Sequence, residues 1–132
     1  MDINPGYAVA AAVSLLAFGI HVFAGGRLMA RPLLVTDLPQ QAKWLLYLCF
    51  HLVSLMVLTM TAVFAWAAVS FLGRPAAMVL TGVAFAATLL CVFVSLRGRL
   101  ALRLNVPLFL YAVIFAGSFW GSFGSLWDLV FQ

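Results

Sequence analysis

The hydrophobic pattern divides the chain into four long apolar stretches that alternate with short polar segments. The stretches cover residues 7–26, 44–72, 76–96 and 106–130, and Asp128, near the end of the last one, is the only charged residue within them. Each stretch is long enough to cross a bilayer as an α-helix, which needs about 20 apolar residues. The pattern therefore predicts an all-α integral membrane protein, folded as a four-helix transmembrane bundle.

Composition supports this prediction and limits the number of domains. Of the 132 residues, 67% are apolar and 8% are charged, whereas soluble domains carry about 25% charged residues. The four spans use most of the chain, so residues 1–132 are expected to form a single domain. Cys49 and Cys91 both lie within spans, where we expect reduced thiols rather than a disulfide framework.

Basic residues predict how the bundle is oriented in the membrane. Six of the seven lie between the first and second spans or between the third and fourth, namely Arg27, Arg31, Lys43, Arg97, Arg99 and Arg103. Only Arg74 lies on the opposite side. The positive-inside rule then predicts that both termini are on the non-cytoplasmic side of a bacterial inner membrane. Because the basic residues flank spans, their expected partners are the lipid bilayer and its anionic head groups, and not nucleic acid.

The two ends of the first span carry their own sequence features. No basic residue precedes Arg27, whereas a secretory signal peptide begins with a basic region, so the first span is expected to stay in the protein. Asn4 and Pro5 are typical of a helix start. Residues 31–35 combine an arginine with apolar residues and are expected to lie in the membrane interface, outside the spans.

Small and polar side chains recur at steps of three and four within each span, which predicts the face turned toward the other helices. The expected inward residues are Ala10, Ser14, Ala17, His21 and Ala24 in the first span, Tyr47, His51, Ser54, Leu58 and Thr61 in the second, Thr81, Ala84, Thr88, Cys91 and Ser95 in the third, and Tyr111, Ser118, Ser122 and Ser125 in the fourth. Gly117, Gly121 and Ser125 also form a helix-packing ladder, which serves either within the bundle or between protomers.

Four residues that can ligate a metal ion fall at one depth in the predicted bundle. His21 and Cys91 precede the basic segments by six residues, and His51 and Tyr111 follow them by eight. All four would lie roughly 9–12 Å inside the bilayer boundary. Imidazole and thiolate bind transition metals such as zinc or copper, and two histidines at one depth can ligate haem b. The alternative is a layer of hydrogen-bonded polar residues that holds the helices in register.

Three observations count against a cofactor at this layer. No carboxylate is near the histidines to orient their rings. The paired His or Cys spacing typical of metal sites is also missing. Neighbouring helices pack at about 8–10 Å, too close for a porphyrin between His21 and His51 unless the helices splay or the haem bridges a dimer.

The same shortage of carboxylates counts against several activities. Apart from Asp128, the spans contain no carboxylate that could serve general acid–base catalysis or a di-iron site. The length and four-span layout resemble those of the small multidrug-resistance transporters, but the glutamate of their first helix is missing here, so the resemblance is not accepted. An enzyme is the less expected outcome. Three interpretations stay open: an accessory or assembly subunit of a homo-oligomer or larger membrane complex, a metal- or haem-binding protein that uses His21 and His51, and a component of a small-solute or lipid transporter.

Overall fold

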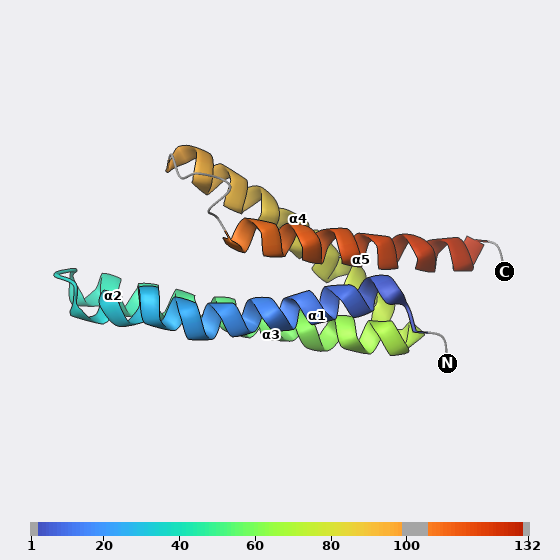
Figure 1. Ribbon diagram of the computed structural model, residues 1–132, viewed down its shortest axis with the longest axis horizontal. Coiled ribbons are helices and arrows are strands. Elements are labelled where there is room, and N and C mark those ends of the chain that lie inside the picture. The colour runs from blue at the N-terminus through green and yellow to red at the C-terminus, as the bar shows by residue number, and fades with distance from the viewer. Residues whose placement is uncertain (1–2, 99–105, 131–132) are drawn as a thin grey trace.

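The computed structural model describes residues 3–98 and 106–130, and for residues 125–130 it describes the backbone only. Within those residues the protein is entirely helical, without a strand (Figure 1). Four of its helices are long and apolar enough to span a membrane, as the hydrophobic pattern predicts. Arg99 and Arg103 lie outside the described residues, and so does the side chain of Ser125.

The first helix is longer than the sequence pattern predicts. It consists of α1 (Pro5–Ile20), the π-helix η1 (His21–Ala30) and α2 (Arg31–Val35), which follow one another without a break. Residues 31–35 are therefore a continuation of the first helix. At the other end Pro5 occupies the first turn, and Asn4 caps the helix because its side-chain oxygen accepts a hydrogen bond from the Tyr7 amide at 3.2 Å.

The remaining helices are α3 (Gln40–Val69), the 3₁₀ turn η2 (Phe71–Gly73), α4 (Arg74–Arg97) and α5 (Val106–Val130). The second span ends earlier than expected because Ser70 adopts an extended conformation. Gly73 closes this turn against α3, where an added Cβ would lie 2.9 Å from the Ala67 nitrogen. Only a residue without a Cβ fits this close approach.

The four helices form an open arrangement. The helix α1 packs between α3 and α5, and α4 packs mainly on α5. Figure 1 shows α4 diverging from the α1–α3 pair toward the end of the molecule at which α2 ends and α3 begins. We call this end, with residues 36–39 and the end of α4, the basic end, and the opposite end, with Asn4 and the Ser70–Gly73 turn, the terminal end.

The terminal end is the tightly packed part of the molecule. Tyr7, Met60, Phe64 and Ile114 are fully buried there, and the Tyr7 hydroxyl lies 3.0 Å from the Ser122 hydroxyl. Asn4 joins three helices, because its backbone N–H donates to the Ala68 carbonyl at 2.9 Å and its side-chain amide donates to the Gly121 carbonyl at 3.1 Å. Such bonds have no competing water within a membrane.

The predicted inward faces agree with the structure to different degrees. In the first span Ala10, Ser14 and Ala17 are buried, but Ala24 is exposed. In the third, Thr81, Ala84 and Ser95 are buried, as are Ser118 and Ser122 in the fourth. The second span was predicted least well, because His51 and Leu58 are exposed while Val57, Met60 and Phe64 form the buried face.

The two threonines of this span form hydrogen bonds within their own helix. Thr61 donates to the Val57 carbonyl at 3.1 Å, and Thr59 donates to the Leu55 carbonyl at 2.9 Å. Each hydroxyl is thus satisfied by its own helix and needs no neighbouring helix. Thr81, Ser95 and Ser122 make the same kind of bond although they are buried, so the bond by itself does not decide which way a hydroxyl faces.

Candidate functional site

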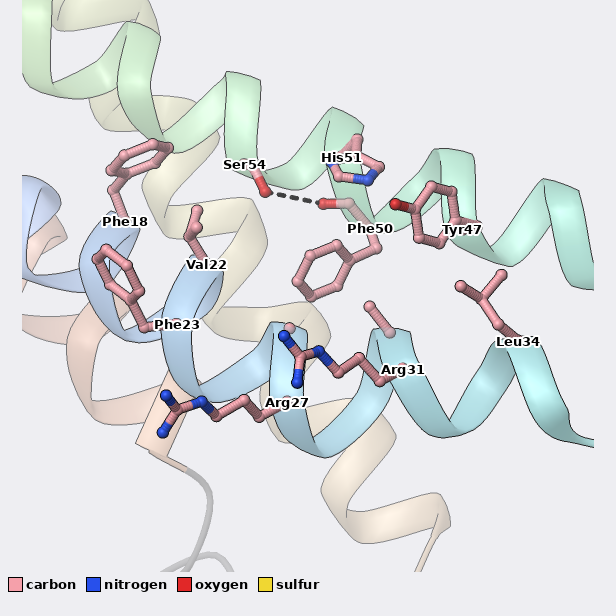
Figure 2. Close-up of a pocket in the computed structure, with 12 residues that line it drawn as sticks. Phe18, Val22, Phe23, Arg27, Arg31, Leu34, Tyr47, Phe50, His51 and Ser54 are labelled. Atoms are coloured by element: carbon pink, nitrogen blue, oxygen red, sulfur yellow. Dashed lines mark hydrogen bonds between the residues drawn. The ribbon is translucent and has the colours of Figure 1, made fainter.

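A groove of about 560 Å³ lies between the first helix and α3 in the half of the molecule nearer the basic end (Figure 2). Its lining consists of Phe18, Val22, Phe23, Gly26, Arg27, Ala30, Arg31 and Leu34 from the first helix and Tyr47, Phe50, His51 and Ser54 from α3. The inner part is apolar and largely aromatic, whereas the part toward the basic end carries two guanidinium groups. The groove is therefore amphipathic along its length.

The π-helix explains why these residues share one face. Phe18, Val22, Gly26, Ala30 and Leu34 are spaced by four residues along the chain, and all of them line the groove. In an α-helix each step of four overshoots a turn by 40°, so this row would drift by about 160° from first to last. The wider i→i+5 turns of η1 counter that drift.

Sequence features account for the π-helix at this position. Gly25 and Gly26 are poor α-helix formers. Pro32 has no N–H to donate into the preceding turns, and local π geometry is one way in which membrane helices accommodate proline. The last π-type bond runs from the Arg31 N–H to the Gly26 carbonyl, directly before the proline. Gly25 also admits α3, since an added Cβ would lie 3.1 Å from the Phe50 ring.

His21 fixes the inner wall of the groove. Its Nε2 donates to the Phe50 carbonyl at 3.1 Å, and its ring stacks on the Phe50 ring with centroids 4.3 Å apart. Because a carbonyl only accepts, this bond selects the tautomer with the proton on Nε2. The same carbonyl accepts from Ser54 at 3.1 Å (Figure 2).

The two histidines expected to share a ligand both contact the Phe50 ring. The Phe50 centroid is 4.3 Å from that of His21 and 5.5 Å from that of His51. His51 is exposed at the edge of the groove, where its ring meets Tyr47 edge-on at 4.5 Å. A metal ion bound at His21 Nε2 would have to replace the hydrogen bond to the Phe50 carbonyl.

The other members of the predicted layer pack elsewhere. Cys91 lies on α4 and Tyr111 on α5, and neither lines the groove. Among the residues that the structure describes, no group of three or more His, Cys, Asp or Glu side chains lies close enough to hold a metal ion. The expected trio of His21, His51 and Cys91 is consequently not assembled.

The glycines of the predicted packing ladder lie against α1. An added Cβ on Gly121 would be 2.9 Å from the Tyr7 nitrogen, and one on Gly117 would be 3.3 Å from the Gly6 carbonyl oxygen. Gly6 faces both of them, so the backbones of α1 and α5 meet directly. This contact lies within one protein chain and not between protomers.

The groove has an unbalanced positive charge at the basic end. Arg27 and Arg31 are exposed, and Figure 2 shows both side chains extending back along the helix toward the aromatic part of the groove. Asp37 is the only carboxylate among the side chains that the structure describes, and it forms no ion pair with either arginine. Lys43 is half-buried on α3 and does not line the groove, and Arg97 ends α4.

Comparisons of this chain with protein-family models, curated proteins and solved structures find no match. The function is therefore argued from the groove itself. Sequence reasoning did not include Phe18, Val22, Phe23 or Phe50 among the candidate site residues, because it assumed the α-helical period. The four-residue spacing that runs from Phe18 to Leu34 is the pattern that could have identified Phe18 and Val22.

Proposed function

We propose that this protein binds an anionic membrane lipid in the groove between the first helix and α3, and that it serves as a lipid-binding component of the membrane and not as an enzyme. The observation that carries the proposal is the position of Arg27 and Arg31 beside an apolar groove. Among the residues described, neither arginine has an acidic partner. A lipid phosphate supplies the missing charge, and its acyl chain supplies the apolar surface.

Size and energetics fit this ligand class. The volume of about 560 Å³ is within the range of roughly 300–1,000 Å³ that small-molecule sites occupy. Within the apolar part, Phe18 lies nine residues from Arg27 along the helix, or roughly 14 Å. This is close to the ~15 Å depth of one leaflet. Each arginine contributes about 1 kcal/mol to binding an anionic surface.

We also propose that the basic end faces the cytoplasm of a bacterial inner membrane and that both termini lie outside. The support is the excess of basic residues at this end. A reporter fused after Gln132 should be active only if it functions outside the cytoplasm, and one inserted beside Asp37 only if it functions inside. The reverse pattern would contradict this orientation.

A second candidate role is that of an accessory or assembly subunit, in a homo-oligomer or a larger complex. The specific observation is that α4 separates from the α1–α3 pair toward the basic end (Figure 1) and that Leu90 and Phe93, in this part of α4, are exposed. A cysteine introduced at Leu90 should form cross-links in native membranes if this face meets another protein. A lack of cross-links, with cysteine at the buried Ala84 as the negative control, would assign the face to lipid.

The lipid-binding proposal is tested by thermal unfolding of the purified protein in neutral detergent with added phosphatidylglycerol or phosphatidylcholine. A ligand that binds only the folded state raises the midpoint with concentration, and phosphatidylglycerol should do so more strongly. Arg27→Gln and Arg31→Gln should each weaken this effect about fivefold. Lys43→Gln removes a charge outside the groove and should not. Equal responses to both lipids, or an equal loss with Lys43→Gln, would overturn the proposal.

A further inference from the structure

A second hollow adjoins the groove on the first helix. It has a volume of about 630 Å³, is shallow, and is lined only by apolar residues between Ala12 and Ala24 of the first helix. Gly19 lies on its floor, where an added Cβ would meet nothing within 4 Å. Phe23 belongs to the linings of both this hollow and the groove. The two concave surfaces are thus neighbours, with the Phe23 side chain between them.

Both surfaces extend from the arginines toward the middle of the membrane. The hollow runs from Ala24, three residues from Arg27, to Ala12, a distance of roughly 18 Å along the helix. The groove extends from Arg27 to Phe18 on the other side of Phe23. The groove matches the ~15 Å depth of one leaflet, whereas the hollow reaches Ala12, fifteen residues or roughly 22 Å from Arg27. Arg27 and Arg31 line the groove and lie beyond the basic end of the hollow.

We propose that the ligand is a phospholipid with two acyl chains and an anionic head group, held with its phosphate at Arg27 and Arg31 and with one chain on each side of Phe23. This inference rests on the proposed function and adds the ligand class. The charge complementarity selects the head group, because no acidic side chain among those described pairs with either arginine. The two parallel apolar surfaces select the number of chains.

The chains are recognised by shape, since lipid tails gain no hydrophobic free energy by moving from bilayer to protein. Contact with Phe18, Val22 and Phe50 in the groove, and with Leu15, Leu16 and Ile20 in the hollow, provides dispersion attraction along each chain. A single-chain lipid would pair its phosphate with the arginines but would leave one of the two surfaces in contact with bulk lipid.

Two glycines offer matched variants for the test. Gly26 lines only the groove and Gly19 only the hollow, and at both an added Cβ meets nothing within 4 Å. Gly26→Leu therefore fills one surface and Gly19→Leu the other. Gly82→Leu, on α4 and away from both, is the control because its Cβ position is also open.

The experiment measures binding of dioleoyl phosphatidylglycerol and of its single-chain lyso form to the detergent-purified protein by native mass spectrometry. The wild type should bind the two-chain lipid about tenfold more tightly, and Gly19→Leu should lower its affinity to that of the lyso lipid without changing lyso binding. Gly26→Leu should weaken both lipids, and Gly82→Leu neither.

The outcomes separate this inference from the proposed function. Equal affinities for the two lipids in the wild type, or two-chain binding unchanged by Gly19→Leu, would overturn the two-chain site while leaving the anionic-lipid site in place. Binding of both lipids that is insensitive to Arg27→Gln and Arg31→Gln would overturn the proposed function, and the two-chain site with it.

Discussion

His21 and Phe50 contact each other in two ways: the imidazole Nε2 donates to the Phe50 carbonyl at 3.1 Å, and the two rings stack with centroids 4.3 Å apart. The contact joins the first π-turn of η1 to α3, next to Gly25. It therefore holds together the two helices that form the groove. In this structure His21 acts as a packing residue, with its Nε2 already engaged.

His21→Ala should destabilise the protein by about 1–2 kcal/mol, since it removes an intramembrane hydrogen bond and a ring stack. His51→Ala should cost less than about 0.5 kcal/mol, because its ring is exposed and makes edge contacts only. The measurement is reversible unfolding in mixed detergent micelles. Equal costs at the two positions, or a bound cofactor lost in both variants, would favour a shared histidine site instead.

Gly121→Ala should destabilise the monomer by about 1–3 kcal/mol, the usual cost of overpacking. The added methyl group would lie 2.9 Å from the Tyr7 nitrogen and 3.0 Å from the Asn4 side-chain oxygen. Gly82→Ala has open space at its Cβ and is the matched control. Unfolding and detergent sizing should show lower stability with an unchanged oligomeric state. A loss of oligomer with unaltered stability would assign this glycine to an interface between protomers.

Asn4→Ala should cost about 1–2 kcal/mol, because it removes the cap of α1 and the bond to the Gly121 carbonyl. Asn4→Ser keeps a capping oxygen but cannot donate across to α5, so its cost should lie between that of alanine and zero. Unfolding free energies of the three proteins test this order. If serine costs as much as alanine, the cap contributes nothing.

Accessibility along the first helix should report the π-helix directly. In a protein with Cys49 and Cys91 replaced, spin labels placed one at a time from Phe18 to Leu34 should show a period close to four residues. Labels at Val79–Val94 of α4 should show the period of 3.6 residues that is typical of an α-helix. A period of 3.6 along the first helix would place Ala30 on a different face from Val22 and would separate the arginines from the groove.

The helices were predicted well because one property of the sequence, its hydropathy, determines where they lie. Long apolar stretches must hydrogen-bond within themselves in a membrane, so the four spans follow from hydropathy alone. Asn4 and Pro5 correctly marked the first helix start. These features depend on local sequence and on the apolar environment of the bilayer, and the hydrophobic pattern along the chain reflects both.

The groove was harder to predict because it depends on helix geometry and on one aromatic ring. The hydrophobic pattern predicted an ordinary α-helix over residues 7–26 and did not reveal that the chain would continue as a π-helix through His21–Ala30. Assigning matched depths to His21 and His51 left out the Phe50 side chain, which both rings contact. The sequence of a single helix does not show which side chain of a neighbouring helix will pack against its residues.

The claim that Arg27 and Arg31 bind an anionic lipid is tested most directly by two double variants of equal net charge. Arg27→Gln with Arg31→Gln removes the charges at the groove, and Lys43→Gln with Arg97→Gln removes two others that do not line it. Native mass spectrometry then counts the phosphatidylglycerol retained by each protein. The account predicts about 30-fold weaker retention for the groove variant and wild-type retention for the other. An equal loss in both, or no loss in either, would contradict it.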